Sequence, residues 1–396
     1  MKTQIAIIAA VVTLSVSWQV HADTVDNLQN MLANGETHGM FRYRFENVDQ
    51  QGVAEQANAS TLLTRLNYTS ATLKGVQALI EFDNVSVIGS ENYNSTINGY
   101  VDHAVVADPK GTELNQASLK YSNDQLEFIA GRQRINLDDQ RFVGGVAWRQ
   151  NEQTFDGYRI VYKPNSAFKL DYSYVYNVNR IFGEDSPSGD LHGKLHFANA
   201  AYQFNKQLTL TGFAYLFDFD SASALSSQTL GLRAKGAITD SLTYTLSYAR
   251  QSDYADNAAS YDADYLLVEL QGRLASVNWT VGYEVLGADN GVSFSTPLAT
   301  AHKFQGFADK FLATPTEGIE DLYLGVSAKI SGVKLAATYH SYQSNEQSID
   351  YGDEINLSAA YAFAKHANVL LKYANYQADD YATDTDKVWL MLTYKY

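Results

Sequence analysis

Apolar and polar side chains alternate, with a period of two residues, along many segments of this chain. In residues 168–176, for example, Phe168 and Leu170 alternate with Lys169 and Asp171. Because successive side chains of a β-strand point to opposite faces, this pattern predicts strands with one apolar and one polar face. One such row also occurs in a soluble β-sandwich, but so many rows in one chain favour a single large β structure.

The connections between these segments are of two kinds. Tight turns fall at 73–74, 123–124, 164–166, 205–206, 239–240, 275–276, 331–332 and 365–366, and long loops fall near 47–60, 84–112, 136–153, 181–193, 219–227, 251–262, 287–319, 343–353 and 378–386. Eight turns alternating with nine loops predict 18 antiparallel strands, or 16 if the segments 193–204 and 207–219 are not strands. Short periplasmic turns, long extracellular loops and an even strand number are typical of outer-membrane barrels.

The first 22 residues carry a different pattern. Lys2 precedes an apolar run over 5–16 and a small-residue cleavage pattern that ends at Ala22, which predicts a secretory signal peptide over residues 1–22. We expect residues 23–396 to form one outer-membrane barrel domain, beginning with a short periplasmic segment over 23–36 that forms one or two helical turns. The chain has no Cys, so disulfides cannot stabilise it.

A membrane-spanning sheet has to close on itself. In hydrocarbon an unpaired backbone group costs several kcal/mol, and an open sheet edge would expose a row of them. A closed barrel of 16 to 18 strands is too wide for its side chains to fill. The pattern therefore predicts a water-filled channel in the outer membrane of a Gram-negative bacterium.

The predicted inner wall is basic, although the chain has 29 Lys and Arg against 44 Asp and Glu and a net charge of −15. Basic residues on the inward parity are Arg42, Arg44, Arg65, Lys120, Arg159, Lys169, Arg233, Lys235, Arg273, Lys329, Lys334, Lys372, Lys387 and Lys395, and the acidic ones are Glu46, Glu81, Asp83, Asp171, Glu269, Glu284 and Asp321. A basic wall concentrates anions, and guanidinium groups suit planar carboxylates. We therefore predict a preference for sugar acids or other carboxylates. The alternative is that wall arginines pair with wall carboxylates and only make the lumen rigid.

The stretch from Gly131 to Gly157 lies between two alternating segments and is unusually rich in matched charges. Its candidate residues are Arg132, Arg134, Asp138, Asp139, Arg141, Trp148, Arg149 and Glu152. Such a loop is expected to fold against other parts of the protein, and we predict that it enters the barrel and narrows the pore. Arg132 and Arg134 fall on the lipid-facing parity of the preceding strand, which requires either a bulge or a strand that has already passed the membrane edge.

Two parts of the sequence carry a resemblance to a known family. MLANGETHGMFRYRFENVDQ at 31–50, followed by NASTLLTRLNYTS at 58–70, and GRQRINLDDQRFVGGVAWRQNEQTFDG at 131–157 resemble the alginate export family of outer-membrane β-barrels. The resemblance implies an 18-stranded barrel, monomeric rather than trimeric, whose Arg-lined pore passes an anionic polyuronate. Alginate itself does not carry over, because many porins whose cargo is unknown share this domain.

Other functions have little support in the sequence. His340 and Ser341 are adjacent in a strand and so face opposite sides, and the eight His residues show no metal-binding spacing, so we expect no catalysis, metal or cofactor. A net acidic chain offers no surface for nucleic acid. The expected partners are outer-membrane lipid, lipopolysaccharide and an anionic oligosaccharide or other small solute. A general non-selective trimeric porin and a structural or adhesive barrel without transport remain alternatives.

Overall fold

The computed structural model describes residues 22–396. The predicted signal peptide lies outside the described residues except for Ala22, where helix α2 (Ala22–Ala33) begins. The helix has 12 residues, about three turns, and is therefore longer than predicted for this segment. Within the described part of the chain, the helices are too short and too polar to span a membrane.

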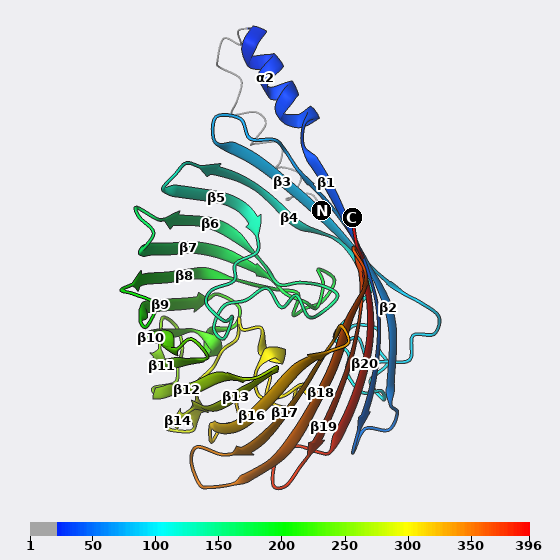
Figure 1. The fold of residues 1–396 in the computed structure, drawn as a ribbon. Helices are drawn as coiled ribbons and strands as arrows, with labels where there is room; N and C mark the ends of the chain where they lie inside the picture. Colours follow the sequence, from blue (N-terminus) through cyan, green and yellow to red (C-terminus); the bar gives the residue numbers. More distant parts are fainter. Residues whose placement is uncertain (1–21) are drawn as a thin grey trace.

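Eighteen antiparallel strands form one sheet that closes into a barrel (Figure 1). Each strand pairs with its sequence neighbours, and β20 pairs with β1 to complete the ring. The strands are β1 (Glu36–Gln50), β2 (Ala57–Thr69), β3 (Val76–Val87), β4 (Gly111–Ser122), β5 (Leu126–Gln133), β6 (Thr154–Tyr162), β7 (Phe168–Asn179), β8 (Asp190–Gln203), β9 (Thr209–Phe219), β10 (Ser227–Thr239), β11 (Leu242–Asp253), β12 (Asp262–Leu274), β13 (Val277–Leu286), β16 (Ile319–Ile330), β17 (Val333–Gln343), β18 (Asp350–Ala364), β19 (Ala367–Gln377) and β20 (Thr385–Lys395). The prediction of 18 strands is confirmed.

All eight predicted tight turns join the strands at one rim, which we call the turn rim. The turn between β16 and β17 consists of Ser331 and Gly332, both with positive φ (49° and 88°), as a two-residue hairpin turn that follows the twist of its strands requires. The opposite rim, the loop rim, carries the long loops. Most of them are shorter than predicted because the strands extend further than the alternation alone indicated, whereas the loop after β5, at 134–153, is two residues longer.

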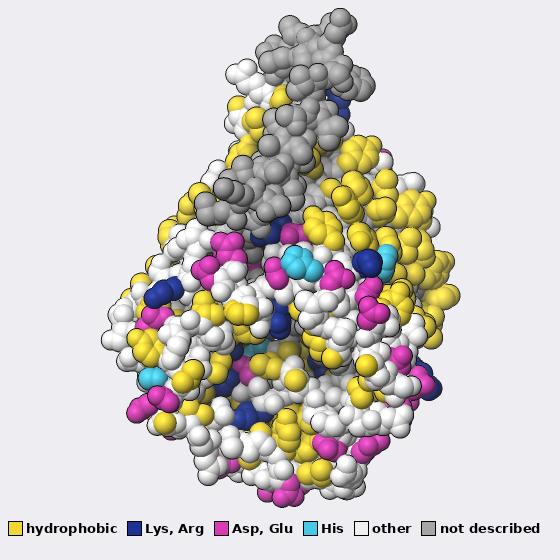
Figure 2. Space-filling model, turned by 180° about the vertical axis from the view of Figure 1, so that it is seen from behind, with side chains coloured by type: hydrophobic (Ala, Val, Ile, Leu, Met, Phe, Trp, Pro, Cys, Tyr) yellow, Lys and Arg dark blue, Asp and Glu magenta, His cyan; other side chains and the backbone are white. Residues whose placement is uncertain are grey.

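The alternation divides the barrel wall into two faces as predicted. Leu322, Leu324 and Val326 of β16 are 55, 52 and 45 % exposed on the outside, whereas Asp321 in the same strand is buried inside. Yellow apolar side chains gather on the outer surface of the barrel in Figure 2. A lipid-facing wall needs apolar side chains on its outer surface, which these rows provide. It also needs every backbone N–H and C=O group to be paired, which the closed sheet provides.

One sector of the inner wall is apolar, contrary to the prediction of a polar wall throughout. Phe213, Tyr215 and Phe217 of β9 and Phe197 of β8 point inward and are buried. The 287–318 loop contains the short elements β14 (Ala288–Asp289), β15 (Val292–Ser293) and η2 (Ala301–Lys303). Phe294 and Leu298 of this loop, with Phe142 and Val143 of the 134–153 loop, pack on the apolar sector and exclude water from it. The parity of 207–219 was ambiguous in the sequence because both faces of β9 are apolar.

Candidate functional site: the pore constriction

Two loops enter the barrel and bind each other. The 134–153 loop connects β5 to β6, and the 287–318 loop connects β13 to β16; both run through the interior in Figure 1. Val143 and Leu298 form a parallel β-bridge, and the N–H of Gly144 donates to the carbonyl oxygen of Leu298 at 2.9 Å. The N–H of Thr300 donates to the carbonyl oxygen of Gln140 at 3.0 Å. The two loops therefore form one unit.

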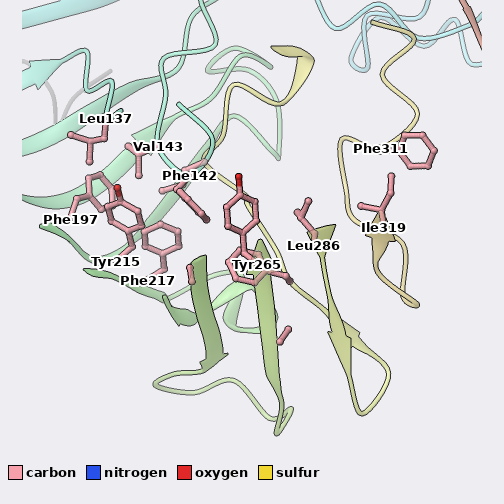
Figure 3. Close-up of a cluster of buried hydrophobic side chains, with 14 of the residues drawn as sticks. Leu137, Phe142, Val143, Phe197, Tyr215, Phe217, Tyr265, Leu286, Phe311 and Ile319 are labelled. Carbon is pink, nitrogen blue, oxygen red and sulfur yellow. The ribbon is translucent and has the colours of Figure 1, made fainter. Parts of the chain in front are cut away.

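Phe142 anchors this unit to the apolar sector of the wall. Its ring centroid lies 5.2 Å from that of Phe213, 5.7 Å from that of Tyr215 and 5.1 Å from that of Tyr265. Figure 3 shows Phe142 pointing between Tyr215 and Tyr265, beside Val143 of the same loop. Burying a Phe side chain contributes about 1.5–3 kcal/mol, so this contact is a major reason for the loop to stay inside.

Arg42 and Arg44 of β1 hold the loop on the opposite side. Arg42 donates from Nε to Oε1 of Gln150 and from Nη1 to the carbonyl oxygen of Ala147, both at 2.9 Å. Arg44, only 1 % exposed, donates from Nη1 to the carbonyl oxygen of Trp148 at 2.5 Å. The prediction that both line an open pore is wrong, because the loop covers them and their buried donors bind its backbone.

A second group of charges ties the loop to β2 and β3. Arg65 donates from Nε to Oδ1 of Asp83 and from Nη1 to Oε1 of Glu152, both at 2.7 Å. Arg134 binds the carboxylates of Glu81 and Glu152. Burial acts to raise the pKa of Glu152, but Arg65 and Arg134 outweigh it and hold this pKa below its ordinary value. Glu152 therefore stays ionised as the centre of a salt-bridge network.

Arg141 connects the two loops to the wall at β13. Its Nε donates to Oε1 of Glu284 at 2.9 Å, and its Nη2 donates to Oε1 of Gln305 in the 287–318 loop at 3.0 Å. The guanidinium also lies over the ring of Phe304, 4.7 Å from its centroid. A single side chain of the 134–153 loop thus fixes both the second loop and the wall.

Arg149 and Asp309 join the loops on the other side. Nη2 of Arg149 lies 3.1 Å from Oδ2 of Asp309, and Nη1 lies 3.2 Å from Oε2 of Glu46. Lys387 of β20 also contacts Asp309, at 3.0 Å. Burial acts to lower the pKa of Arg149, but Glu46, Asp108 and Asp309 outweigh it and raise this pKa above its ordinary value. All of these charges are buried and depend on one another.

His302 lies at the centre of the constriction. Its ring stacks on Trp148 with 4.2 Å between centroids and 5° between planes. Oδ1 of Asp309, an ionised carboxylate oxygen that can only accept, is 2.6 Å from Nδ1, so Nδ1 carries the ring proton and donates to it. Nε2 then accepts from Nζ of Lys372 at 2.7 Å. Burial lowers the pKa of His302 to about 3, and the ring is neutral at pH 7.

We expect the constriction to loosen as the pH falls from about 6.5 towards 3. A loop released into water returns its imidazole to an ordinary pKa of about 6.5, so the released form binds more protons below that pH, and the closed form loses about 1.4 kcal/mol per pH unit. Asp309 acts in the same direction, but only below its ordinary pKa of about 3.8, so the response between pH 7 and 4 comes from His302. Burial would raise its pKa, but His302 and Lys387 hold it well below the ordinary value, so protonation at low pH breaks its contacts. Single-channel recordings from pH 7 to 4 should show rising mean conductance and more frequent openings.

The matched pair of variants for this pH response is His302→Phe and His192→Phe. His302→Phe keeps an aromatic ring beside Trp148 but cannot titrate, so we expect a flatter pH response. His192 lies exposed at the loop rim, so its replacement should leave the response intact. Equal pH profiles for His302→Phe and the unmodified chain would contradict the assignment.

The constriction separates two cavities. A vestibule of about 520 Å³ on the loop-rim side is lined by Trp148, Arg149 and His302 together with other loop residues. A chamber of about 560 Å³ on the other side is lined by the wall strands and by the segment 303–307. Figure 2, which views the molecule from behind, shows a hollow in the middle of the visible face with Lys and Arg side chains inside it. The two cavities share no lining residue, which supports the prediction that the 134–153 loop narrows the pore.

The remaining predicted wall residues fall into two groups. Arg159 and Lys169 both bind Asp171, at 2.7 and 2.9 Å, and Arg233 binds Asp139 at 2.9 Å. Lys120, Arg273, Lys329 and Lys334 lie on the inner face closer to the turn rim, with no carboxylate within 4 Å among the described residues. The bases on the inner wall are thus of two kinds: paired bases, which contact a carboxylate, and open bases, which do not.

Arg132 does not belong to the constriction. It is in β5, which has no register shift against β4 or β6, and stays on the outward face two residues beyond Ala130. Nε and Nη2 bind Asp156 at 2.8 and 3.0 Å, in a polar pocket that also includes His192. Of the two predicted explanations for an outward-facing Arg132, a bulge or a strand that has already passed the membrane edge, the structure shows the second: Arg132 lies at the end of β5 near the loop rim. Arg134 follows the last strand residue and turns inward.

Sequence reasoning missed the role of the 287–318 loop. Thr300, His302, Gln305 and Asp309 all contact the 134–153 loop or Trp148, but none of them was a candidate. The length of the 287–318 loop could have marked it as a candidate, because no other connection between wall strands is as long in the described chain. Length shows that a loop can reach the lumen but does not identify its partner.

Comparisons with known proteins agree with this geometry. A sequence profile described as alginate export matches residues 36–326. The crystal structure of Acinetobacter baumannii OccAB4 superposes with a TM-score of 0.73 at 14 % identity, covering 93 % of this chain and 99 % of that one. Pseudomonas aeruginosa OccK3 (OpdO) gives a TM-score of 0.72 at 14 % identity, covering 95 % and 99 %.

At this identity the two structures show the fold alone. No curated protein matches the sequence. The family profile covers well over half of the chain and includes the 134–153 loop, β1 and β2, from which most of the constriction contacts come. The chain therefore belongs to the alginate export family and is a channel-forming β-barrel of the bacterial outer membrane.

Proposed function

We propose that this channel carries small anionic, carbohydrate-like solutes, such as sugar acids, by passive diffusion. The chamber on the turn-rim side of the constriction and the wall below it would form the selective part of the path. Solutes are distinguished there by the charges that remain free to interact with them.

The observation that carries the proposal is the difference between basic and acidic residues on the inner wall. Eight of the predicted wall bases have no carboxylate within 4 Å among residues 22–396: Arg42 and Lys372, which are buried, and Lys120, Lys235, Arg273, Lys329, Lys334 and Lys395. Six of the seven predicted wall acids contact an Arg or His side chain: Glu46, Glu81, Asp83, Asp171, Glu284 and Asp321. The seventh, Glu269, accepts hydrogen bonds from Tyr323 and Gln271. Free positive charge therefore exceeds free negative charge along the wall.

Lys329 and Lys334 add a second indication. They stand directly opposite each other on neighbouring strands β16 and β17. Like charges directly opposite destabilise a sheet, and a narrow low-dielectric wall strengthens their field. An anion that passes between them would relieve this repulsion.

A non-selective channel is the second candidate. The buried arginines Arg65, Arg141, Arg149 and Arg159 are all paired with carboxylates, as the rigid-lumen alternative predicts. Such pairs fix the constriction without attracting anions. The two candidates differ in what the open lysines do.

Reversal potentials in asymmetric KCl distinguish the two candidates. We expect purified channels in planar bilayers to favour chloride over potassium. The double variant Lys329→Glu/Lys334→Glu should abolish or reverse this preference, because it places two acids near the turn rim where the unmodified wall has two facing lysines. The same charge change at two turns, Lys163→Glu/Lys365→Glu, is the matched control and should have little effect. Cation preference in the unmodified channel would contradict the proposal, and an absence of conductance would favour a structural barrel.

A further inference from the structure

We propose that Arg233, Lys235 and Lys303 form a carboxylate-binding subsite in the chamber, and that Asp139 of the 134–153 loop occupies it until a solute carboxylate displaces it. This inference rests on the proposed anion channel and specifies where its solute binds. Nothing in the family match or in the similar folds assigns a role to this turn of the loop.

Arg233 supplies the fixed half of the subsite. Its side chain is only 5 % exposed, and its Nη1 lies 2.9 Å from Oδ1 of Asp139. Nε and Nη2 have no hydrogen-bond partner in the described structure. A guanidinium binds a carboxylate best through two parallel N–H groups, so contact with Asp139 through one nitrogen leaves most of its binding capacity unused.

Two lysines complete the subsite from different elements. Lys235 follows Arg233 on the same face of β10, about 7 Å further along the strand. Lys303 reaches in from the 287–318 loop and donates from Nζ to the carbonyl oxygen of Asp139 at 2.8 Å. Neither lysine has a carboxylate within 4 Å among residues 22–396, and all three bases line the same chamber.

The turn that carries Asp139 is strained. Asp138 and Gln140 have positive φ, 50° and 71°, a conformation that costs non-glycine residues about 1–3 kcal/mol. Oδ2 of Asp138 accepts from Asn199 at 2.7 Å, so this carboxylate is turned away from Arg233. Burial raises the pKa of Asp138, and the positive charges of Arg233 and Lys235 act against this rise. Asp139 is therefore the carboxylate in direct contact with the subsite.

The rest of the chamber suits a hydroxylated solute. The nearby strands β12, β13 and β17 offer Gln271, Thr280 and Thr338, which can exchange hydrogen bonds with hydroxyl groups. A volume of about 560 Å³ lies within the range of small-molecule sites. The chemical class that matches both the three bases and these polar side chains is a monomeric or short polyhydroxy acid with at least one carboxylate.

Competition follows from this arrangement. A solute carboxylate can use the free Nε and Nη2 of Arg233 together with Lys235, and it replaces the contact between Arg233 and Asp139. Oδ1 of Asp139 also accepts from the N–H of Arg141 at 3.2 Å. Lys303 holds the backbone carbonyl oxygen of Asp139 and not its carboxylate, so the turn stays anchored while the side chain of Asp139 leaves the subsite. Until it is displaced, this side chain keeps the subsite closed to weakly binding anions such as chloride.

The test is block of single-channel current by D-galacturonate, with neutral D-galactose as the comparison sugar. We expect Asp139→Asn to lower the half-blocking concentration of galacturonate roughly tenfold, which corresponds to about 1.4 kcal/mol, and to leave galactose unaffected. Arg233→Gln should raise it by a similar factor. Lys235→Gln, at an exposed position that cannot affect folding of the loop, should raise it to a smaller extent.

Glu269→Gln is the matched control, because it removes one negative charge from the same chamber without touching the three bases. We expect less than a twofold change in galacturonate block for this variant. Equal effects of Asp139→Asn and Glu269→Gln would overturn the subsite and show a general charge effect. An anion-selective channel in which neither Asp139→Asn nor Lys235→Gln alters block would also overturn the subsite but leave the proposed function standing. Cation selectivity of the unmodified channel would refute the proposed function itself.

Discussion

Replacing residues 135–152 by a four-residue Gly-Ser linker is expected to raise the single-channel conductance several-fold. The 134–153 loop fills the lumen between β1 and β9, and Phe142, Arg141 and Arg149 hold the 287–318 loop beside it. Without these contacts the second loop loses its partners. An 18-stranded barrel is wide enough to enclose an open aqueous channel once its loops no longer cross it.

The barrel itself should tolerate this replacement. Gln133 at the end of β5 stands opposite Phe155 at the start of β6, so four residues close the gap between paired strands. The wall residues that lose partners, such as Arg42 and Arg65, become hydrated by the widened lumen and do not remain buried as unpaired charges. Heat-dependent migration in SDS gels and a β-rich circular dichroism spectrum would verify that the barrel still forms.

The matched control is replacement of the 344–349 loop by a linker of the same composition. This loop joins β17 to β18 at the same rim but lines neither the vestibule nor the chamber. We expect its conductance to match that of the unmodified channel. If the 135–152 replacement conducts no better than this control, the loop is not the constriction.

Arg149→Ala is expected to destabilise the closed constriction by about 3–5 kcal/mol, since it removes one partner from a buried ion-pair network and leaves carboxylates uncompensated. The guanidinium lies between Glu46 of the wall and Asp309 of the 287–318 loop. Lys387 remains near Asp309, but Glu46 keeps only Arg44. The two carboxylates then repel each other across the gap, and the loops separate.

Hydrogen exchange measured by mass spectrometry should show this separation. We expect faster exchange in 134–153 and 287–318 and unchanged exchange in the strands, together with larger current fluctuations. Arg250→Ala is the control, because Arg250 forms a comparable pair with Asp262 at 3.1 Å but on the exposed outer rim, where such pairs contribute little. Exchange rates in Arg149→Ala that resemble those of Arg250→Ala would mean that packing of Phe142 alone holds the loop.

Local sequence predicted the barrel well because strand geometry is a local property. Side chains at alternate positions must point to opposite faces, so the row Leu322, Leu324 and Val326 identified both a strand and its outer face. Turn residues such as Ser331 and Gly332 marked where strands end. Eighteen strands, their order and the single closed sheet followed from these two signals.

The matched charges of the 131–157 stretch also indicated a loop that folds against other parts of the protein. Arg141, Trp148, Arg149 and Glu152 do so. Arg132 was the exception, because the exact end of β5 decides whether its side chain stays on the outer face or turns inward. Strand ends depend on pairing with neighbours and are poorly marked in the sequence.

Sequence by itself therefore determined the architecture: which segments are strands, which face meets lipid and which side of the wall carries the bases. Tertiary structure alone decided which of these bases are free. Arg42 and Lys120 share the inward parity, yet Arg42 is covered by residues more than 100 positions away and Lys120 is not. Alternation is set by neighbouring residues, whereas the burial and pairing of a charge depend on segments that meet only when the closed barrel brings the 134–153 and 287–318 loops together.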